Sequence, residues 1–276
     1  MHQTLDLRLL DPIQMEVTLE VAACGVCSLS FGELAELQRK LPRSWPPALT
    51  PQLLKHADPQ TLASLMAVDR ALTDCEMDAN QLASWSVASA PRHLGREAAA
   101  MVVDRYRSNG AWGVPVHITP HRSTHSVAST ISLGYGIRGP AIGCGGGHGA
   151  ERDALLTAAC LLDDPACDGV LLVCSGWSPE LAVSPEGVPL NDAQCQAVAL
   201  ALVRTDKHAG CGSLTIGPPR LDRVPASAES LGSASLVEQL ASWRGGRFAW
   251  QTAASSSLMV RFELDRPTHC REGEPR

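Results

Sequence analysis

Residues 140–162 have the sequence PAIGCGGGHGAERDALLTAACLL, and this stretch decides the fold. It predicts a short strand at Pro140–Cys144, a tight turn at Gly145–Gly149 and an apolar-striped helix at Ala150–Leu162. A strand that ends in glycines before a helix brings side chains to the free N–H groups at the helix N-terminus. We therefore expect a functional site at this turn.

Strands and helices alternate along the rest of the chain. Strands are expected at residues 15–21 (ending before Gly25), 81–88, 169–174, 196–203, 213–216 and 258–264. Helices are expected at residues 31–39, 62–72, 96–106, 126–135 and 236–243. The continuous apolar run at 169–174 is typical of a strand that is covered on both faces. This order predicts the α/β class, with helices on both faces of the sheet.

The composition is that of an ordinary globular protein. The chain has 276 residues, a net charge of −6 and 45% hydrophobic residues. Its mild acidity argues against nucleic acid or an anionic membrane surface as a partner. We find no apolar run of the roughly 20 residues that a membrane helix needs. The first residues lack a basic region followed by an apolar block, so we expect a cytoplasmic protein without a secretory signal.

The cysteines and histidines give weak indications of a metal site. Of the ten cysteines, Cys24 and Cys27 alone form a Cys-x-x-Cys pair, and zinc sites of that kind need a second pair or a His-x-x-x-His partner at suitable spacing. His117, His121 and His125 are spaced by four, but a proline interrupts the helix and no acidic ligand lies among them. We expect reduced thiols, solvated histidines, no metal and no cofactor.

The glycine turn itself permits several interpretations. Residues 145–150 fit a loose G-x-G-x-x-G/A pattern of dinucleotide binding, although the strand before them is short for that fingerprint. A nucleophile elbow would need Gly-x-Ser-x-Gly, which is absent from the sequence. The glycines are also compatible with a turn that only allows close packing of helix and sheet.

Several segments resemble the β-ketoacyl synthase branch of the thiolase-fold superfamily. Residues 22–32 (AACGVCSLSFG) resemble the first strand and turn of that family. Residues 131–140 (ISLGYGIRGP) resemble the segment before its active-site strand, which typically ends in Gly-x-x-Gly-Pro. The following helix, Cys167–Gly169 and the strand Val170–Cys174 keep the family's order and spacing. The resemblance implies a layered thiolase-like fold with mixed sheets and helices on both faces.

The sequence departs from the family where catalysis takes place. Active ketosynthases carry the nucleophilic cysteine eight residues beyond the proline that corresponds to Pro140, and His148 occupies that position here. Without a thiolate, the chain lacks the covalent acyl intermediate. The family's two later histidines are also missing, because His208 and His269 stand in other contexts and Ser233 replaces one expected histidine. We expect residues 1–205 to form a ketosynthase-like half and residues 206–276 an abbreviated second half, packed as one domain.

This combination resembles the chain-length factors, inactive ketosynthase relatives that pair with an active ketosynthase and help shape its acyl tunnel. The resemblance implies a heterodimer with an active ketosynthase, in polyketide or fatty-acid-like biosynthesis, and contact with an acyl carrier protein through the complex. It also implies an interface along the strand before the turn, formed by Pro140, Ala141, Ile142, Gly143 and Cys144.

Two alternatives remain open. In the first, the chain is an acyl-transferring or condensing enzyme in which Cys144 is the nucleophile and His148 the base. Against it, Cys144 lies within the predicted strand, away from the helix N-terminus that would lower the pKa of a thiol. In the second, the chain is a degenerate homologue that serves only as a scaffold.

Overall fold

A computed structural model of the protein describes residues 16–74, 77, 79–114, 118–147, 149–184, 189–205, 210–218, 235–243, 247–255 and 258–264. The strands are β1 (Val17–Ser30), β2 (Ser86–Pro91), β3 (Ala141–Gly143), β4 (Val170–Ser178), β5 (Gln194–Arg204), β6 (Gly212–Gly217), β7 (Phe248–Ser255) and β8 (Leu258–Leu264). The helices are α1 (Phe31–Arg39), α2 (Pro51–Leu54), α3 (Pro59–Asp74), α4 (Arg96–Asn109), α5 (Ile118–Arg122), α6 (His125–Tyr135), α7 (Ala150–Leu162) and α8 (Leu236–Ser242), with 3-10 turns η1 (Ala79–Leu82) and η2 (Ala111–Gly113).

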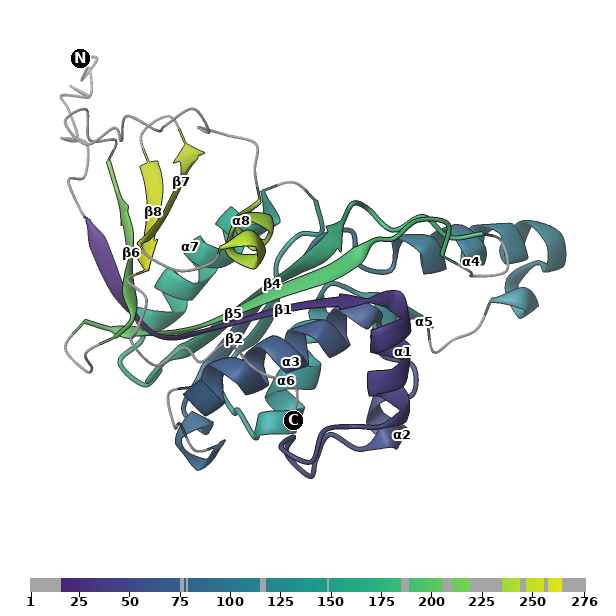
Figure 1. The fold of residues 1–276 in the computed structure, drawn as a ribbon, viewed down its shortest axis with the longest axis horizontal. Helices are drawn as coiled ribbons and strands as arrows, with labels where there is room; N and C mark the ends of the chain where they lie inside the picture. The colour runs from purple at the N-terminus through teal and green to yellow at the C-terminus, as the bar shows by residue number, and fades with distance from the viewer. Residues whose placement is uncertain are drawn as a thin grey trace, which may run out of the picture.

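The strands form an eight-stranded mixed sheet in the order β3-β2-β4-β5-β1-β6-β8-β7. β2 is parallel to both of its neighbours, β3 and β4, and the other pairings are antiparallel. Figure 1 shows α3 and α6 below the sheet and α7 and α8 above it. The expected α/β class, with helices on both faces of the sheet, is confirmed.

The central strands are apolar on both faces because each face is covered by helices. Along β4, Leu171 and Val173 contribute to the core under α3 and α6, whereas Leu172 and Cys174 contribute to the core under α7 and α8. Successive side chains of a strand point to opposite faces, so a continuous apolar run serves both cores at once. The strand that was expected at 169–174 is therefore present, and it continues to Ser178.

The first strand is longer than its sequence pattern predicted. β1 passes through Gly25 and ends at Ser30, where the Ser30 side chain caps α1. A Cβ atom at Gly25 would lie 2.1 Å from the Ala67 carbonyl oxygen and 2.6 Å from the Ala71 nitrogen, both on α3. Gly25 therefore does not end the strand; it allows the helix to cross the strand in close contact.

Two strands differ from what the sequence predicted. The strand expected at 81–88 is wrong in its first half, because η1 extends to Leu82 and β2 begins at Ser86. Strand β7 was not expected, although its partner β8 was. The division into residues 1–205 and 206–276 stays a prediction. Among the described residues, none of the helices is long and apolar enough to cross a membrane.

Candidate functional site

The candidate site lies at the carboxyl ends of the parallel strands β2, β3 and β4. The chain leaves β2 through α4, α5 and α6 to reach β3, and it leaves β3 through α7 to reach β4. Because α6 and α7 lie on opposite faces of the sheet, the connections after β2 and β3 diverge. Ligand sites of open α/β sheets lie at such a switch point.

The glycine turn after β3 combines close packing with an unusual backbone conformation. A Cβ atom at Gly143 would lie 2.4 Å from the Thr124 carbonyl oxygen, just before α6. Gly149 precedes α7 with a φ of 91°, a value that side-chain-bearing residues rarely adopt. Around Gly145 and Gly147 there is open space. Two of these glycines are thus required by local geometry. His148, the residue at the expected nucleophile position, lies outside the described residues.

Cys144 is buried at the end of β3. Its backbone N–H donates to the Ser89 carbonyl oxygen at 2.7 Å, and its thiol donates to Thr157 Oγ1 on α7 at 3.5 Å. Burial raises the pKa of the Cys144 thiol, and this outweighs the hydrogen bond to Thr157, which lowers the pKa; the nearby Asp153 carboxylate adds a smaller upward contribution. The protonated thiol is therefore favoured, which is opposite to the activation that a nucleophilic cysteine needs.

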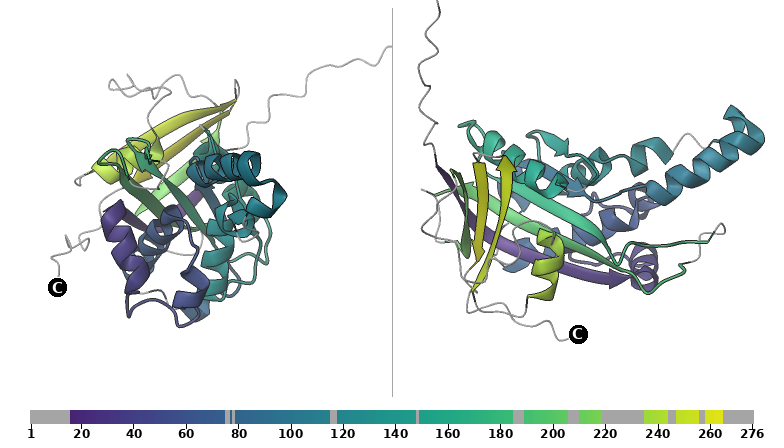
Figure 2. Two further views of the ribbon diagram at one scale, coloured as in Figure 1. Left: turned by 90° about the vertical axis from the view of Figure 1, so that its right-hand side faces the viewer. Right: turned by 90° about the horizontal axis from the view of Figure 1, so that it is seen from above.

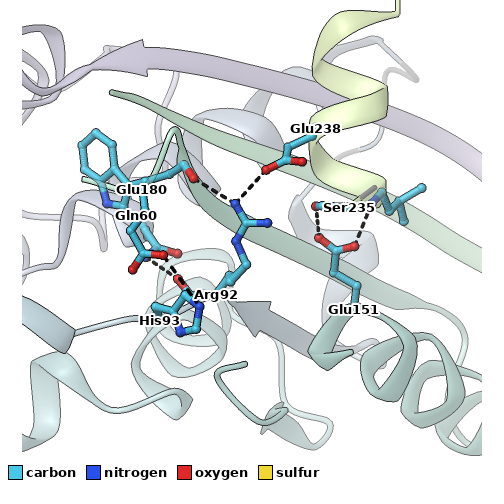
Figure 3. Close-up of polar contacts among 9 residues, drawn as sticks. Gln60, Arg92, His93, Glu151, Glu180, Ser235 and Glu238 are labelled. Atoms are coloured by element: carbon cyan, nitrogen blue, oxygen red, sulfur yellow. Dashed lines mark hydrogen bonds and ion pairs between the residues drawn. The ribbon is translucent and has the colours of Figure 1, made fainter. Parts of the chain in front are cut away.

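The first turn of α7 carries two carboxylates, Glu151 and Asp153. The hydroxyl of Ser235 donates to Glu151 Oε1, and the backbone N–H of Leu236 donates to Glu151 Oε2 at 2.7 Å (Figure 3). Glu151 therefore joins the N-terminus of α7 to the N-terminus of α8. Carboxylates in this position also offset the positive potential of the α7 dipole.

A partly buried polar network surrounds Arg92, the residue after β2. Arg92 Nη2 donates to the Trp177 carbonyl oxygen at 2.9 Å and to Glu238 Oε1 on α8 at 2.8 Å. On the other face of the sheet, Gln60 Nε2 donates to the Arg92 carbonyl oxygen at 2.9 Å, and Ser175 Oγ donates to Gln60 Oε1 at 3.1 Å. Figure 3 shows Arg92 between these groups. The network connects α3, β2, β4 and α8.

His93 follows Arg92 in a strained conformation beside the glycine turn. Its φ is 55°, and its backbone N–H donates to the Gly146 carbonyl oxygen at 2.6 Å. Its imidazole lies 3.8 Å from Glu180, measured from Nε2 to Oε2, and Glu180 also accepts from Arg96 at 2.7 Å. Arg92, His93 and Glu180 could not be found from the sequence pattern, because the ion-pair partners of Arg92 and His93 lie on distant segments of the chain, at Glu238 and Glu180.

The residues considered for metal binding do not come together. Cys24 and Cys27 lie on the same strand an odd number of residues apart, and Cys27 belongs to the core under α3 while Cys24 packs against the opposite core. His121 lies on α5, whereas His125 is the first residue of α6. His117 lies outside the described residues. Within the described ranges, no group of three metal-ligating side chains is close enough to hold an ion.

The strand that was expected to form an interface lies at an edge of the sheet. Ala141, Ile142 and Gly143 pair with β2 on one side, and no described strand pairs with them on the other. Ile142 is 36% exposed, and Leu133 on the adjacent helix α6 is 64% exposed. Within the part of the chain that the structure describes, the outer side of β3 therefore has no partner strand, and the Ile142 side chain is partly exposed there.

Comparison with known proteins identifies the fold. A scan against protein-family models and a search of curated protein sequences both find no match. A solved structure of a type II polyketide synthase acyl-carrier protein in complex with its ketosynthase is 14% identical, with a TM-score of 0.51, over 72% of this chain and 68% of that chain. A β-ketoacyl synthase from Burkholderia phymatum STM815 is 12% identical, with a TM-score of 0.50, over 72% of this chain and 63% of that chain.

A third structure, a ketosynthase in complex with its chain length factor from Xenorhabdus doucetiae, is 12% identical, with a TM-score of 0.48, over 89% of this chain and 99% of that chain. At these identities the likeness concerns the fold. The protein has the thiolase-like fold of the ketosynthases, as the sequence resemblance implied.

Proposed function

We propose that this protein is a non-catalytic β-ketoacyl synthase homologue, comparable to a chain-length factor. In this role it pairs with an active ketosynthase in polyketide or fatty-acid-like biosynthesis and helps to shape the acyl tunnel of that partner. An acyl carrier protein then meets the complex rather than this chain alone.

The observation that carries the proposal is the environment of the N-terminus of α7. In a ketosynthase-like fold this position must activate a thiol and stabilise negative charge on the acyl oxygen. Here the preceding thiol, Cys144, is buried and its pKa is raised. The first turn of α7 carries two carboxylates, Glu151 and Asp153, and one guanidinium, Arg152, which pairs with Asp153 at 2.8 Å. The net charge of the turn is therefore negative, which disfavours both a thiolate and an oxyanion at this helix N-terminus. These features support a role without a covalent acyl intermediate.

The edge strand β3 supports the pairing. Its outer backbone groups have no partner strand among the described residues, and the side chains of Ile142 in β3 and of Leu133 on helix α6 are exposed. A second protein that adds a strand at this edge would satisfy the backbone groups and cover the apolar side chains. The interface expected at Pro140–Cys144 is thus compatible with the structure and remains part of the proposal.

Intact-mass spectrometry tests the proposal directly. The purified chain is incubated with acetyl and malonyl thioesters of an acyl carrier protein, alone and with the ketosynthase encoded nearest to it in its genome. We expect no acyl group on this chain, and native spectra with a one-to-one complex whose other subunit is acylated. Acylation of this chain that Cys144→Ala abolishes and Cys160→Ala leaves intact would establish an acyl-transferring enzyme instead.

A further inference from the structure

Helix α8 covers the sheet next to the candidate site, although it belongs to a distant part of the chain. It packs on β5, β1 and β4, on the same face of the sheet as α7. Figures 1 and 2 (left view) show α8 above the sheet and α3 below it. The apolar side chains of Leu236, Val237 and Leu240 are buried. The helix therefore forms part of the cover over the carboxyl ends of the central strands.

Helix α8 is capped by a residue of α7 rather than by its own N-cap residue. The side chain of Ser235, at the N-cap, makes no hydrogen bond to the first turn of its own helix. It donates to Glu151 Oε1 instead, and Glu151 Oε2 accepts from the Leu236 N–H at 2.7 Å. A helix of two turns is marginal by itself, because its first hydrogen bond requires several residues to be fixed at once. The helical form of α8 therefore depends on the Glu151 carboxylate.

A second charged contact holds the same turn of α8 to the end of β2. Glu238 Oε1 accepts from Arg92 Nη2 at 2.8 Å, and Figure 3 shows this pair beside the contact of Glu151 with Ser235. The Arg92 side chain is 19% exposed, so little water competes for its guanidinium. We call these two contacts, of Glu151 with the start of α8 and of Arg92 with Glu238, the latch.

The latch decides whether α8 stays in place. Burial of three apolar side chains favours the closed position, but ordering the seven residues of the helix costs conformational entropy of similar size. The charged contacts therefore determine the balance. Segments with few buried apolar contacts open locally, without unfolding of the whole domain.

Two buried thiols on neighbouring strands distinguish local opening from unfolding. Cys174 of β4 belongs to the core under α7 and α8. Burial raises the pKa of the Cys174 thiol, and the nearby Glu151 carboxylate raises it further. Cys195 of β5 is also buried, but it belongs to the core under α3 on the opposite face. Displacement of α8 uncovers the side of the sheet that carries Cys174 and leaves Cys195 covered.

We propose that α8 is a latched cover of the candidate site, which Glu151 and Arg92 hold closed and which opens as a unit while the sheet stays folded. Opening exposes the Arg92 guanidinium and the α7 face of β4 together. The inference concerns contacts within this chain, so it does not depend on the proposed function.

Thiol labelling with N-ethylmaleimide at neutral pH, followed by peptide mapping, tests the proposal. In the wild-type chain we expect Cys174 to react at least about 10-fold faster than Cys195, because local opening is more frequent than unfolding. Glu151→Ala should raise the Cys174 rate about 10-fold or more, since it removes charged hydrogen bonds. The matched control is Asp153→Ala, which removes a carboxylate from the same turn of α7 that pairs with Arg152 and not with α8. It should leave the Cys174 rate at the wild-type value.

Urea separates the two routes to labelling. Local opening exposes little surface, so the Cys174 rate should hardly change up to about 1 M urea, whereas the Cys195 rate should rise steeply. If Glu151→Ala does not fold, Glu238→Ala removes the other half of the latch and should raise the Cys174 rate by a similar factor. Equal rates and equal urea dependence of the two thiols in the wild type overturn the proposal. A Cys174 rate that the latch variants leave unchanged also overturns it. Neither result bears on the proposed function, which the acylation experiment tests separately.

Discussion

Replacement of Gly25 by alanine tests how closely α3 crosses β1. The added methyl group would lie 2.1 Å from the Ala67 carbonyl oxygen and 2.6 Å from the Ala71 nitrogen. Both are backbone atoms of a buried helix, so the whole helix must retreat by more than about 1 Å to restore van der Waals contact. Overpacking of this kind costs about 1–3 kcal/mol, and the displacement of α3 places Gly25→Ala at about 3 kcal/mol.

Gly32→Ala is the matched control, because a Cβ atom at Gly32 has nothing within 4 Å and the residue lies in α1. Alanine has a higher helix propensity, so the control should be stabilised by about 0.5–1 kcal/mol. Urea unfolding followed by tryptophan fluorescence measures both variants. With a slope of about 3 kcal/mol/M, the midpoint should fall by about 1 M for Gly25→Ala and rise slightly for the control. A Gly25→Ala midpoint equal to that of the wild type would refute the close contact.

Three other predictions concern the site and its surroundings. Burial raises the pKa of Cys144, so this thiol should react with iodoacetamide much more slowly at pH 7.5 than the thiol of the exposed Cys160. The reaction rate of Cys144 should increase only at higher pH. Equal rates for the two cysteines, measured by peptide mapping, would contradict the burial of Cys144. Asp58→Asn removes the charge that pairs with Arg122 and should lower the free energy of unfolding by about 2 kcal/mol in urea, less than for a fully buried pair because the Arg122 side chain is 31% exposed; a loss below about 0.5 kcal/mol would show that the pair is unimportant. Ile142→Lys, at the edge of β3 where the side chain is 36% exposed, should leave the chain folded with a slightly lower melting temperature, and should weaken the complex with the ketosynthase more than about 10-fold in native mass spectra; normal complex formation would exclude that edge from the interface.

The sequence predicted the elements around the glycine turn because their patterns are local. The short strand before Cys144, the turn and the apolar stripe of α7 are specified by neighbouring residues, and the structure confirms the strand and the helix. Strand β7 was not predicted because the second half of its sequence, FAWQTAAS, consists of small and polar residues. Its pairing with β8 stabilises the strand in the folded protein. Periodicity reports which residues share a face, but not which strand lies next to which.

The candidate site depends on which strands and helices become neighbours, and the sequence pattern does not show this. The position of β3 at the sheet edge follows from the order of crossovers, which no residue of β3 encodes. The contact between Glu151 and Ser235 joins residues 84 positions apart, and the pair of Arg92 and Glu238 spans 146. Such contacts arise when helices and strands assemble, so a local pattern cannot reveal them. The family resemblance predicted a site at the glycine turn, which stays a prediction, whereas the charges and hydrogen bonds around that turn became visible only in the fold.

The central position of β1 in the sheet has a consequence for synthesis. β1 ends at Ser30, but its partners β5 and β6 begin at Gln194 and Gly212. At about 5–20 residues per second, the ribosome takes roughly 10–30 seconds to make the intervening chain. During that interval β1 has two unpaired edges and an apolar surface that α3 covers on one side only. The nascent chain is therefore expected to require a chaperone until β5 emerges, and a slower translation rate would prolong its exposure to aggregation.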